Sequence, residues 1–278
     1  MDKPAGLTSH DVVRLVRRAY GTRAVGHTGT LDPFATGLLV LLVGRATRLA
    51  RFVEAERKTY LATARLGWRT DTDDLTGSPA SPAADASRLD PEIVRREIRG
   101  LVGAQLQRPP AFSAKHVAGQ RAYAMARRGE AVELPEVPVT VYATEALEVR
   151  PPLVVFRVVA SAGTYIRALA RDLGERLGVG GHLTALRREA IGGLRVDDAV
   201  PADRIADTVP LLPPQAVLRG MPAVELDAAG VTDAAHGRLL AAPAGADGRV
   251  LLMHEGRLVA IARAAAGRLQ PEVVLERP

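Results

Sequence analysis

Hydrophobic residues recur every three or four positions in three segments of the chain, a spacing typical of one face of a helix. We therefore predict helices over residues 9–20, 90–103 and 164–178. The residues expected to cap them are Ser9, Asp90 and Thr164. A fourth hydrophobic segment, residues 34–50, is also predicted to be helical, with Gly44 dividing it into two parts.

Alternation of side-chain character, which is typical of strands, occurs over residues 59–66. Tyr60 lies in this strand, where a tyrosine more often belongs to the core than to a functional site. Residues 139–149 and 153–160 predict two further strands. From residue 222 to 278, strand-like stretches are separated by glycines, which predicts a small β-barrel at the end of the chain.

The segments between these elements are polar. Residues 67–87 are rich in Gly, Pro and Ser, and their carboxylates, Asp71 and Asp73 among them, lack the spacing of a calcium loop. We predict a solvated, mobile loop there. Residues 108–129 mix proline, glycine and arginine, as expected of a basic segment that becomes ordered on binding. Residues 201–220 predict a short helix and a proline-rich linker.

Composition adds limits to this picture. With 278 residues, 47% of them hydrophobic, the chain can form one large domain and a small one. Its longest apolar run, residues 38–43, is far too short to span a bilayer, and the N-terminus lacks the pattern of an export signal. We therefore expect a cytoplasmic protein. The absence of cysteine excludes disulfides and thiolate metal sites.

Charge indicates the class of partner. The formal net charge is +6 and the isoelectric point about 10.1, which favours a polyanion. Nearly all the basic residues are arginine, whose planar fork suits phosphate and can stack on bases. The only lysines are Lys3, Lys58 and Lys115. The composition thus points to nucleic acid.

One stretch, residues 26–39, combines three glycines and three threonines with a single carboxylate, Asp32. Glycine allows unusual backbone angles and close approach of a large partner. From the local sequence alone, however, Asp32 followed by Pro33 could be no more than the start of a helix, as at Asp90 and Pro91. The residues of this stretch by themselves leave both interpretations open.

A family resemblance favours the functional interpretation of Asp32 over the helix cap. Residues 26–33, Gly-His-Thr-Gly-Thr-Leu-Asp-Pro, followed by Ala-Thr-Gly at 35–37, resemble the signature of TruB-type tRNA pseudouridine synthases. Further segments resemble the same family: Lys-Thr-Tyr at 58–60, Gly-Thr-Tyr-Ile-Arg at 163–167 and the stretch 182–188. Residues 105–137 resemble the insertion that closes over RNA, with Phe112 in place of a common tyrosine and His116 in place of a usual lysine.

The resemblance implies roles for particular residues. Asp32 matches the catalytic aspartate, and the other catalytic residues it implies are Arg167 and Tyr60. The implied substrate-binding residues are His27, Tyr60, Tyr165 and Leu186, and the implied RNA-binding residues are Lys3, Lys115, Arg121, Arg127 and Arg188. The reaction would flip a uridine out of the T loop of tRNA, cleave its glycosidic bond and rejoin the base through carbon. It needs no cofactor.

Elementary electrostatics points to one pair among these residues. An arginine in the first turn of a helix is unfavourable, because the helix dipole there prefers anions. A nearby carboxylate would offset this, so we expect Arg167 beside Asp32, where it would also keep the acid ionised. Two routes remain open for that acid: attack at the ribose C1′, or removal of a ribose proton to give a glycal. The six histidines lack metal-ligand spacing, and we expect no metal.

The resemblance also implies an α+β fold. It predicts a catalytic domain over residues 1–215, with a mixed, largely antiparallel sheet flanked by helices, and a PUA-like RNA-binding domain over residues 220–278. A hydrophobic strand expected before Asp2 is not in this sequence. We expect a monomer that binds the T stem-loop of tRNA. Two alternatives are a catalytically silent RNA-binding protein or tRNA chaperone, and a carboxylate hydrolase that would need a second acid near Asp32.

Overall fold

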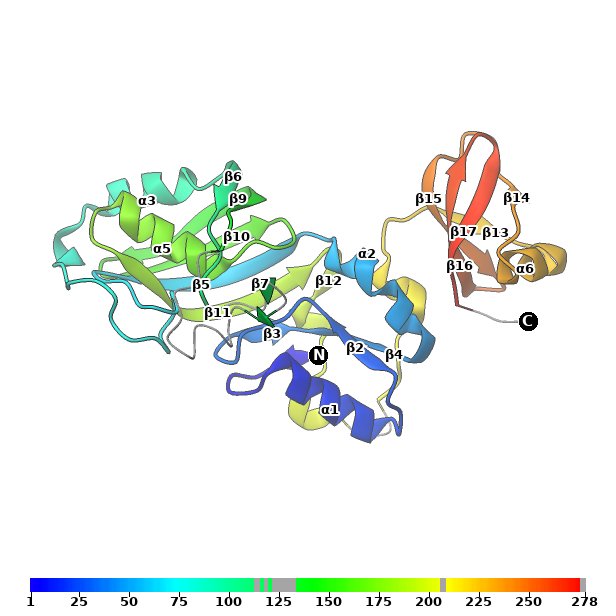
Figure 1. The fold of residues 1–278 in the computed structure, drawn as a ribbon, viewed down its shortest axis with the longest axis horizontal. Helices are drawn as coiled ribbons and strands as arrows, with labels where there is room; N and C mark the ends of the chain where they lie inside the picture. The colour runs from blue at the N-terminus through cyan, green and yellow to red at the C-terminus, as the bar shows by residue number, and fades with distance from the viewer. Residues whose placement is uncertain (113–115, 118–119, 122–133, 206–208, 276–278) are drawn as a thin grey trace.

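The larger part of the molecule is built on an eight-stranded sheet (Figure 1). The computed structural model describes residues 1–112, 116–117, 120–121, 134–205 and 209–275. The strands follow the order β1-β3-β11-β5-β10-β9-β6, and β12 pairs with β11. Their bounds are β1 (Asp2–Lys3), β3 (Thr36–Leu38), β5 (Lys58–Leu66), β6 (Gly103–Gln107), β9 (Val137–Arg150), β10 (Leu153–Ala160), β11 (Gly181–Ile191) and β12 (Leu194–Arg195).

Pairing in this sheet is antiparallel except between β3 and β11, which run parallel. The predicted mixed, largely antiparallel sheet is therefore confirmed. The strands expected over residues 59–66, 139–149 and 153–160 are present as β5, β9 and β10.

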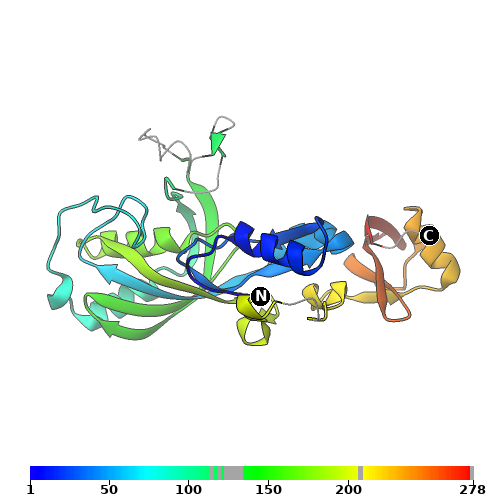
Figure 2. The same ribbon diagram turned by 90° about the horizontal axis from the view of Figure 1, so that it is seen from below.

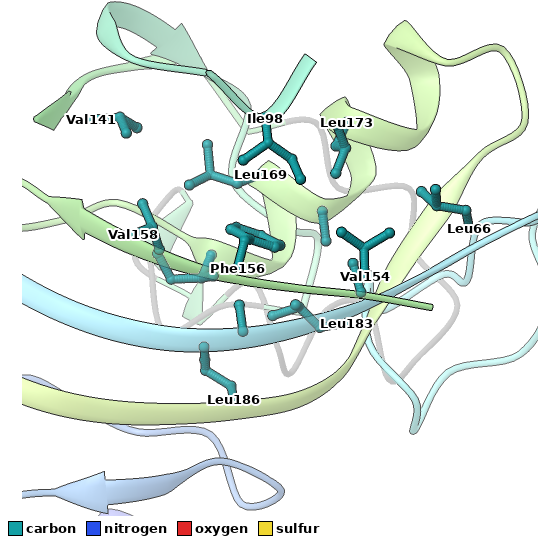
Figure 3. Packing of buried hydrophobic residues seen from close by; sticks show 14 of the residues in the cluster. Leu66, Ile98, Val141, Val154, Phe156, Val158, Leu169, Leu173, Leu183 and Leu186 are labelled. Carbon is teal, nitrogen blue, oxygen red and sulfur yellow. The ribbon is translucent and has the colours of Figure 1, made fainter. Parts of the chain in front are cut away.

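Helices α3 (Pro91–Arg99) and α5 (Ile166–Arg176) lie on one face of the sheet (Figures 1 and 2). Their periodic hydrophobic residues enter the main core, where Ile98 and Leu169 pack with Phe156 of β10 (Figure 3). Burial of these rows is the main force holding the helices in place. The amphipathic segments of the sequence thus predicted both helices.

Two predicted helix caps are wrong and one is confirmed. Helix α1 (Ser9–Ala19) is capped by Thr8 in a reciprocal capping box with Asp11, while the Ser9 side chain is buried. Asp90 caps α3 as expected. Helix α5 begins after Tyr165, not Thr164, and no side chain at its own start caps it.

The helix predicted over residues 34–50 is wrong before Gly44, where the chain forms strands, while the part after Gly44 is helical. This segment forms β3, β4 (Val40–Val43) and a 3₁₀ turn (Gly44–Leu49) before the short helix α2 (Ala50–Glu54), and β4 pairs with β2 (Val25–Thr28). At Gly37, φ is +103°, and an added Cβ would lie 2.3 Å from the Arg188 carbonyl oxygen. This close approach to β11 decides in favour of a strand. No helix follows Pro33, so Asp32 is not a helix cap.

The C-terminal part forms a second, five-stranded sheet at one end of the elongated molecule (Figure 1). Its order is β13-β15-β16-β17-β14. The bounds are β13 (Ala223–Glu225), β14 (Leu240–Ala241), β15 (Gly248–His254), β16 (Arg257–Ala265) and β17 (Arg268–Val274). The sheet is curled, as expected of a PUA-like domain, and a helix that the sequence pattern did not predict, α6 (Ala228–Ala235), packs beside it.

A shared hydrophobic cluster joins the two parts. Leu49 and Phe52, from the segment that follows β4, pack with Leu251 and Ile261 of the second sheet. The Arg45 guanidinium also donates to the carbonyl of Leu275 at 3.0 Å. The expected boundaries at 215 and 220 stay predictions.

Within residues 105–137 the structure describes β6, the short pair β7 (His116–Val117) and β8 (Gln120–Arg121), and the beginning of β9. In Figure 2 the short pair stands off the helical side of the sheet. Where the structure describes residues 201–220, they hold two 3₁₀ turns (Ala202–Arg204 and Pro214–Val217). Two further 3₁₀ turns are Ala86–Arg88 and Val196–Asp198.

Candidate active site

Two buried cations hold the loop that carries Asp32. Arg188 donates from Nε to the Leu38 carbonyl at 2.7 Å and from Nη2 to the Gly29 carbonyl at 2.9 Å. The Lys3 ammonium donates to three carbonyls, those of Pro4, Leu7 and Pro33. Both ends of the loop are therefore fixed to the protein interior.

This finding corrects the role expected for these two cations. Lys3 and Arg188 are 0% and 1% exposed, so neither charged group lies where a phosphate could reach it. Burial lowers the pKa of Lys3 to about 8, although the negative charge of Asp32 acts in the opposite direction. We therefore assign both residues to shaping the loop instead of contacting RNA.

A serine fixes the residue before the acid. The Ser9 hydroxyl accepts a hydrogen bond from the Leu31 N–H at 2.9 Å and lies 3.2 Å from the Leu31 carbonyl, to which it donates. Both backbone groups of Leu31 are thus held by one side chain of α1. The position of Asp32 is set from both sides along the chain.

Asp32 and Arg167 form the expected ion pair. Arg167 Nε lies 3.0 Å from Asp32 Oδ2, and Nη2 donates to Oδ1 at 3.3 Å. The Nε contact is close but not aligned as a hydrogen bond. The Arg167 side chain is 6% exposed, whereas that of Asp32 keeps 34% of its surface exposed. A ligand can therefore reach the carboxylate, while the guanidinium stays behind it.

A second carboxylate, which sequence reasoning missed, lies on the same guanidinium. Asp74 Oδ2 is 3.2 Å from Arg167 Nη1, and its Oδ1 accepts from the Thr76 N–H at 2.9 Å. Arg167 also donates to the carbonyls of Thr72 and Phe112 at 2.9 and 3.0 Å. Its fork is thus shared among four acceptors. The one sequence signal was an acid-rich loop together with an arginine in a first helical turn.

One turn further along α5, Arg171 repeats this arrangement. It pairs with Asp73 at 2.9 Å and Asp172 at 2.8 Å, and donates to the Arg108 carbonyl at 3.0 Å. Burial raises the pKa of Asp73 to about 6, against the lowering effect of Arg171. The prediction of a solvated loop over residues 67–87 is therefore wrong at Asp73 and Asp74, which are buried and pair with arginines of α5.

The electrostatics of Asp32 reflect this setting. Burial raises the pKa of its carboxyl above the usual value, and Arg167 opposes that rise most strongly. Asp74 raises the pKa further, and Lys3 lowers it. Arg167 is thus the main group that favours the ionised acid, which is the role expected of it.

The residues expected to bind the substrate lie on neighbouring elements. Tyr60 of β5 pairs in register with Arg188 of β11, and Leu186 pairs with Ala62 two positions along. Tyr60 and Leu186 pack in the same core cluster as Leu31, the residue before Asp32. Strands β5 and β11 thus bring Tyr60 and Leu186 into the core that also holds the residue before the acid.

Tyr165 and His27 lie on two other elements. Tyr165 is half-buried at the start of α5, two residues before Arg167. His27 is half-buried in β2, and burial together with the charge of Arg188 lowers its pKa. Its Nδ1 is buried without a hydrogen-bond partner within the described part of the protein.

Three expected RNA contacts are not placed. Lys115 and Arg127 lie outside the described residues, and only the backbone of Arg121 is described, in β8. Among the residues that the structure covers, no three His, Asp or Glu side chains gather as metal ligands would. No helix in those residues is long and apolar enough to cross a membrane.

Sequence comparison decides the family. Residues 17–166 match the N-terminal domain of TruB family pseudouridylate synthases. Residues 167–213 match the C-terminal domain of tRNA pseudouridylate synthase B. The chain belongs to the TruB family. Membership makes it an isomerase that converts uridine to pseudouridine in tRNA, as the motifs predicted.

Other members and more distant structures agree with this assignment. The TruB chain is 46% identical to tRNA pseudouridine synthase B of Thermobifida fusca (strain YX), over 99% of this chain and 96% of that protein. It is 44% identical to the Corynebacterium aurimucosum protein of the same name, over 100% of this chain and 95% of the other. A solved Cbf5-Nop10-Gar1 complex contains a chain that is 26% identical, with a TM-score of 0.75 over 99% of this chain and 84% of that one.

Proposed function

We propose that this TruB enzyme isomerises uridine 55, in the T loop of tRNA, with Asp32 as the catalytic carboxylate. One observation carries the proposal: a carboxylate with a third of its surface exposed is held by a buried guanidinium. An exposed acid can touch a substrate, and the cation behind it favours the charged form.

The reaction exchanges one bond to the ribose for another. The bond from N1 of uracil to C1′ breaks, the base turns, and a bond from C5 to C1′ forms. C5 loses a proton and N1 gains one, so no oxidant or reductant is consumed. Asp32 contributes either by attacking C1′ or by removing a ribose proton to give a glycal, and both routes require the ionised acid.

Arg167 and Asp74 would keep the acid in place and charged. The four acceptors around the Arg167 fork leave the guanidinium little freedom to turn, so its position beside Asp32 is defined before substrate arrives. Asp74 has no free face, since its side chain is 5% exposed. It therefore orients Arg167 and does not serve as the second acid that a hydrolase would need.

Tyr60, Leu186 and Tyr165 would receive the flipped base. Extrusion of a nucleotide costs a few kcal/mol, and stacking on an aromatic ring returns about 1–3 kcal/mol. Tyr60 and Leu186 lie on adjacent strands, in the same core cluster as the residue before the acid, which suits a base held between a ring and an aliphatic side chain. His27 would fill the position that the base leaves in the RNA.

The wider RNA contacts follow from charge. We propose that Lys115, Arg121 and Arg127 of the insertion bind the phosphates of the T stem-loop, and that the PUA-like domain binds RNA as well. Such contacts would make binding strongly dependent on salt. The monomeric state and the cytoplasmic location stay predictions.

Substitution of Asp32 by asparagine tests the proposal. Asp32→Asn keeps size and polarity but removes the charge, so we expect pseudouridine formation in unmodified tRNA to stop while tRNA affinity is nearly unchanged. Asp90→Asn is the matched control, because it changes the other Asp-Pro sequence, where asparagine also caps the helix. Wild-type turnover by Asp32→Asn would remove this acid from the mechanism. Tight binding without product by the wild type would favour the RNA-chaperone alternative.

A further inference from the structure

The start of α5 is held by a side chain that is distant in sequence. No residue at the helix terminus caps it, but the Gln107 amide bonds to both backbone groups of Tyr165. The Tyr165 N–H donates to Gln107 Oε1 at 2.8 Å, and Gln107 Nε2 donates to the Tyr165 carbonyl at 3.1 Å. Gln107 is 1% exposed, so water does not compete for these bonds.

This pair of hydrogen bonds joins the end of β6 to the start of α5. Gln107 is the last residue of β6, where Val137 of β9 pairs with it, and Tyr165 precedes Arg167 by two residues. The segment that follows Gln107 makes two further contacts with the same helix: the Arg108 carbonyl with Arg171 and the Phe112 carbonyl with Arg167. The end of β6 and the segment after it therefore contact the first two turns of α5, with Gln107 at the helix start and the Phe112 carbonyl on Arg167.

We propose that Gln107 is a positioning residue for the isomerisation: by fixing Tyr165 it sets the direction in which Arg167 points toward Asp32. The inference rests on the proposed function of Arg167 and Asp32. Arg167 meets Asp32 through contacts of 3.0 and 3.3 Å, one of them poorly aligned, and its acceptors fix the guanidinium only while the helix backbone that carries it stays in place. Misplacement by about 1 Å can cost about a hundredfold in rate.

The chemistry of the side chain makes the proposal specific. The site needs one acceptor for the Tyr165 N–H and one donor for the Tyr165 carbonyl, and an amide supplies both. Methionine fills the same space with neither. An ionised glutamate offers only acceptors and would repel the carbonyl, whereas a protonated glutamate again offers one donor and one acceptor. Glutamate at this position should therefore work only in its neutral form.

The experiment compares Gln107→Met and Gln107→Glu with wild type in single-turnover reactions at pH 8 and pH 5.5. At pH 8 we expect both variants to lose about tenfold to a hundredfold in rate with tRNA affinity within about threefold of wild type. At pH 5.5 the Gln107→Glu variant should return to within about threefold of wild type measured at that pH, because burial raises a carboxyl pKa. Gln107→Met should show no such rescue.

Gln105→Glu is the control, since it places the same charge on the same strand, at a glutamine whose amide, within the described residues, bonds to the Leu101 carbonyl and not to α5. It should follow wild type at both pH values. A Gln107→Glu variant whose rate relative to wild type is the same at both pH values would overturn the proposal, as would full activity of Gln107→Met. Failure of the proposed function would appear differently, as absence of product from wild type or turnover by Asp32→Asn.

Discussion

Replacing Arg167 with lysine separates the charge of the active site from its geometry. The substitution keeps one positive charge but removes the planar fork that reaches Asp32, Asp74 and the carbonyls of Thr72 and Phe112. A lysine ammonium is a single point and cannot span acceptors on three segments of the chain. We expect at least two charge-assisted hydrogen bonds to be lost, each contributing about 1.5–3 kcal/mol.

The loss should appear in both stability and rate. Stability should fall by about 3–5 kcal/mol, as when a buried ion pair is broken. Because Asp32 would lose its aligned partner, turnover should fall by about a hundredfold or more, the scale expected for removal of a preorganised electrostatic group. Binding of tRNA should change little, since the Arg167 side chain is 6% exposed and lies behind the acid.

Arg171→Lys provides a matched control. Arg171 is on the same helix, is buried to a similar degree, and pairs with Asp73 and Asp172 instead of Asp32. We expect a similar loss of stability, measured by urea unfolding, but turnover within about fivefold of wild type, because no contact to Asp32 is altered. Turnover is measured as tritium released from tRNA labelled at C5 of uridine, since C5 loses its hydrogen. Equal losses of turnover in the two variants would refute the assigned role of Arg167.

Three further predictions concern the loop and the acid. Gly37→Ala should lower the free energy of unfolding, measured in urea, by several kcal/mol more than Gly44→Ala. Both glycines have positive φ, but only Gly37 lies against the backbone of Arg188. Equal losses in the two variants would contradict the argument from close approach. Because the raised pKa of Asp32 belongs to a group that must be ionised, kcat/KM should fall with decreasing pH at a higher pH than for an ordinary aspartate. Asp74→Asn removes a charge that raises this pKa, so the fall of kcat/KM should begin at a lower pH than in wild type. A shift to higher pH would show that the charge of Asp74 does not raise the pKa of Asp32.

Local pattern was sufficient for much of the architecture. The amphipathic rows of α3 and α5 and the alternation in β5, β9 and β10 were readable because each element buries one face against a single core. The opposite case is the part of residues 34–50 that precedes Gly44, where an apolar run was interpreted as a helix. That segment forms strands because Gly37 lies against Arg188, about 150 residues away in the chain, and no local pattern contains this contact.

The active site divides in the same way. The sequence by itself was sufficient to predict the family, to single out Asp32 as the candidate catalytic acid and to predict its ion pair with Arg167. Short motifs, and the unfavourable energy of a cation in the first turn of a helix, are local properties. Only the tertiary structure decided that Asp74 shares the guanidinium, that Lys3 and Arg188 are buried and hold the loop, and that Gln107 holds the start of α5. These contacts join segments far apart in the chain, and their energies depend on burial, which becomes defined only when the sheet and helices have packed.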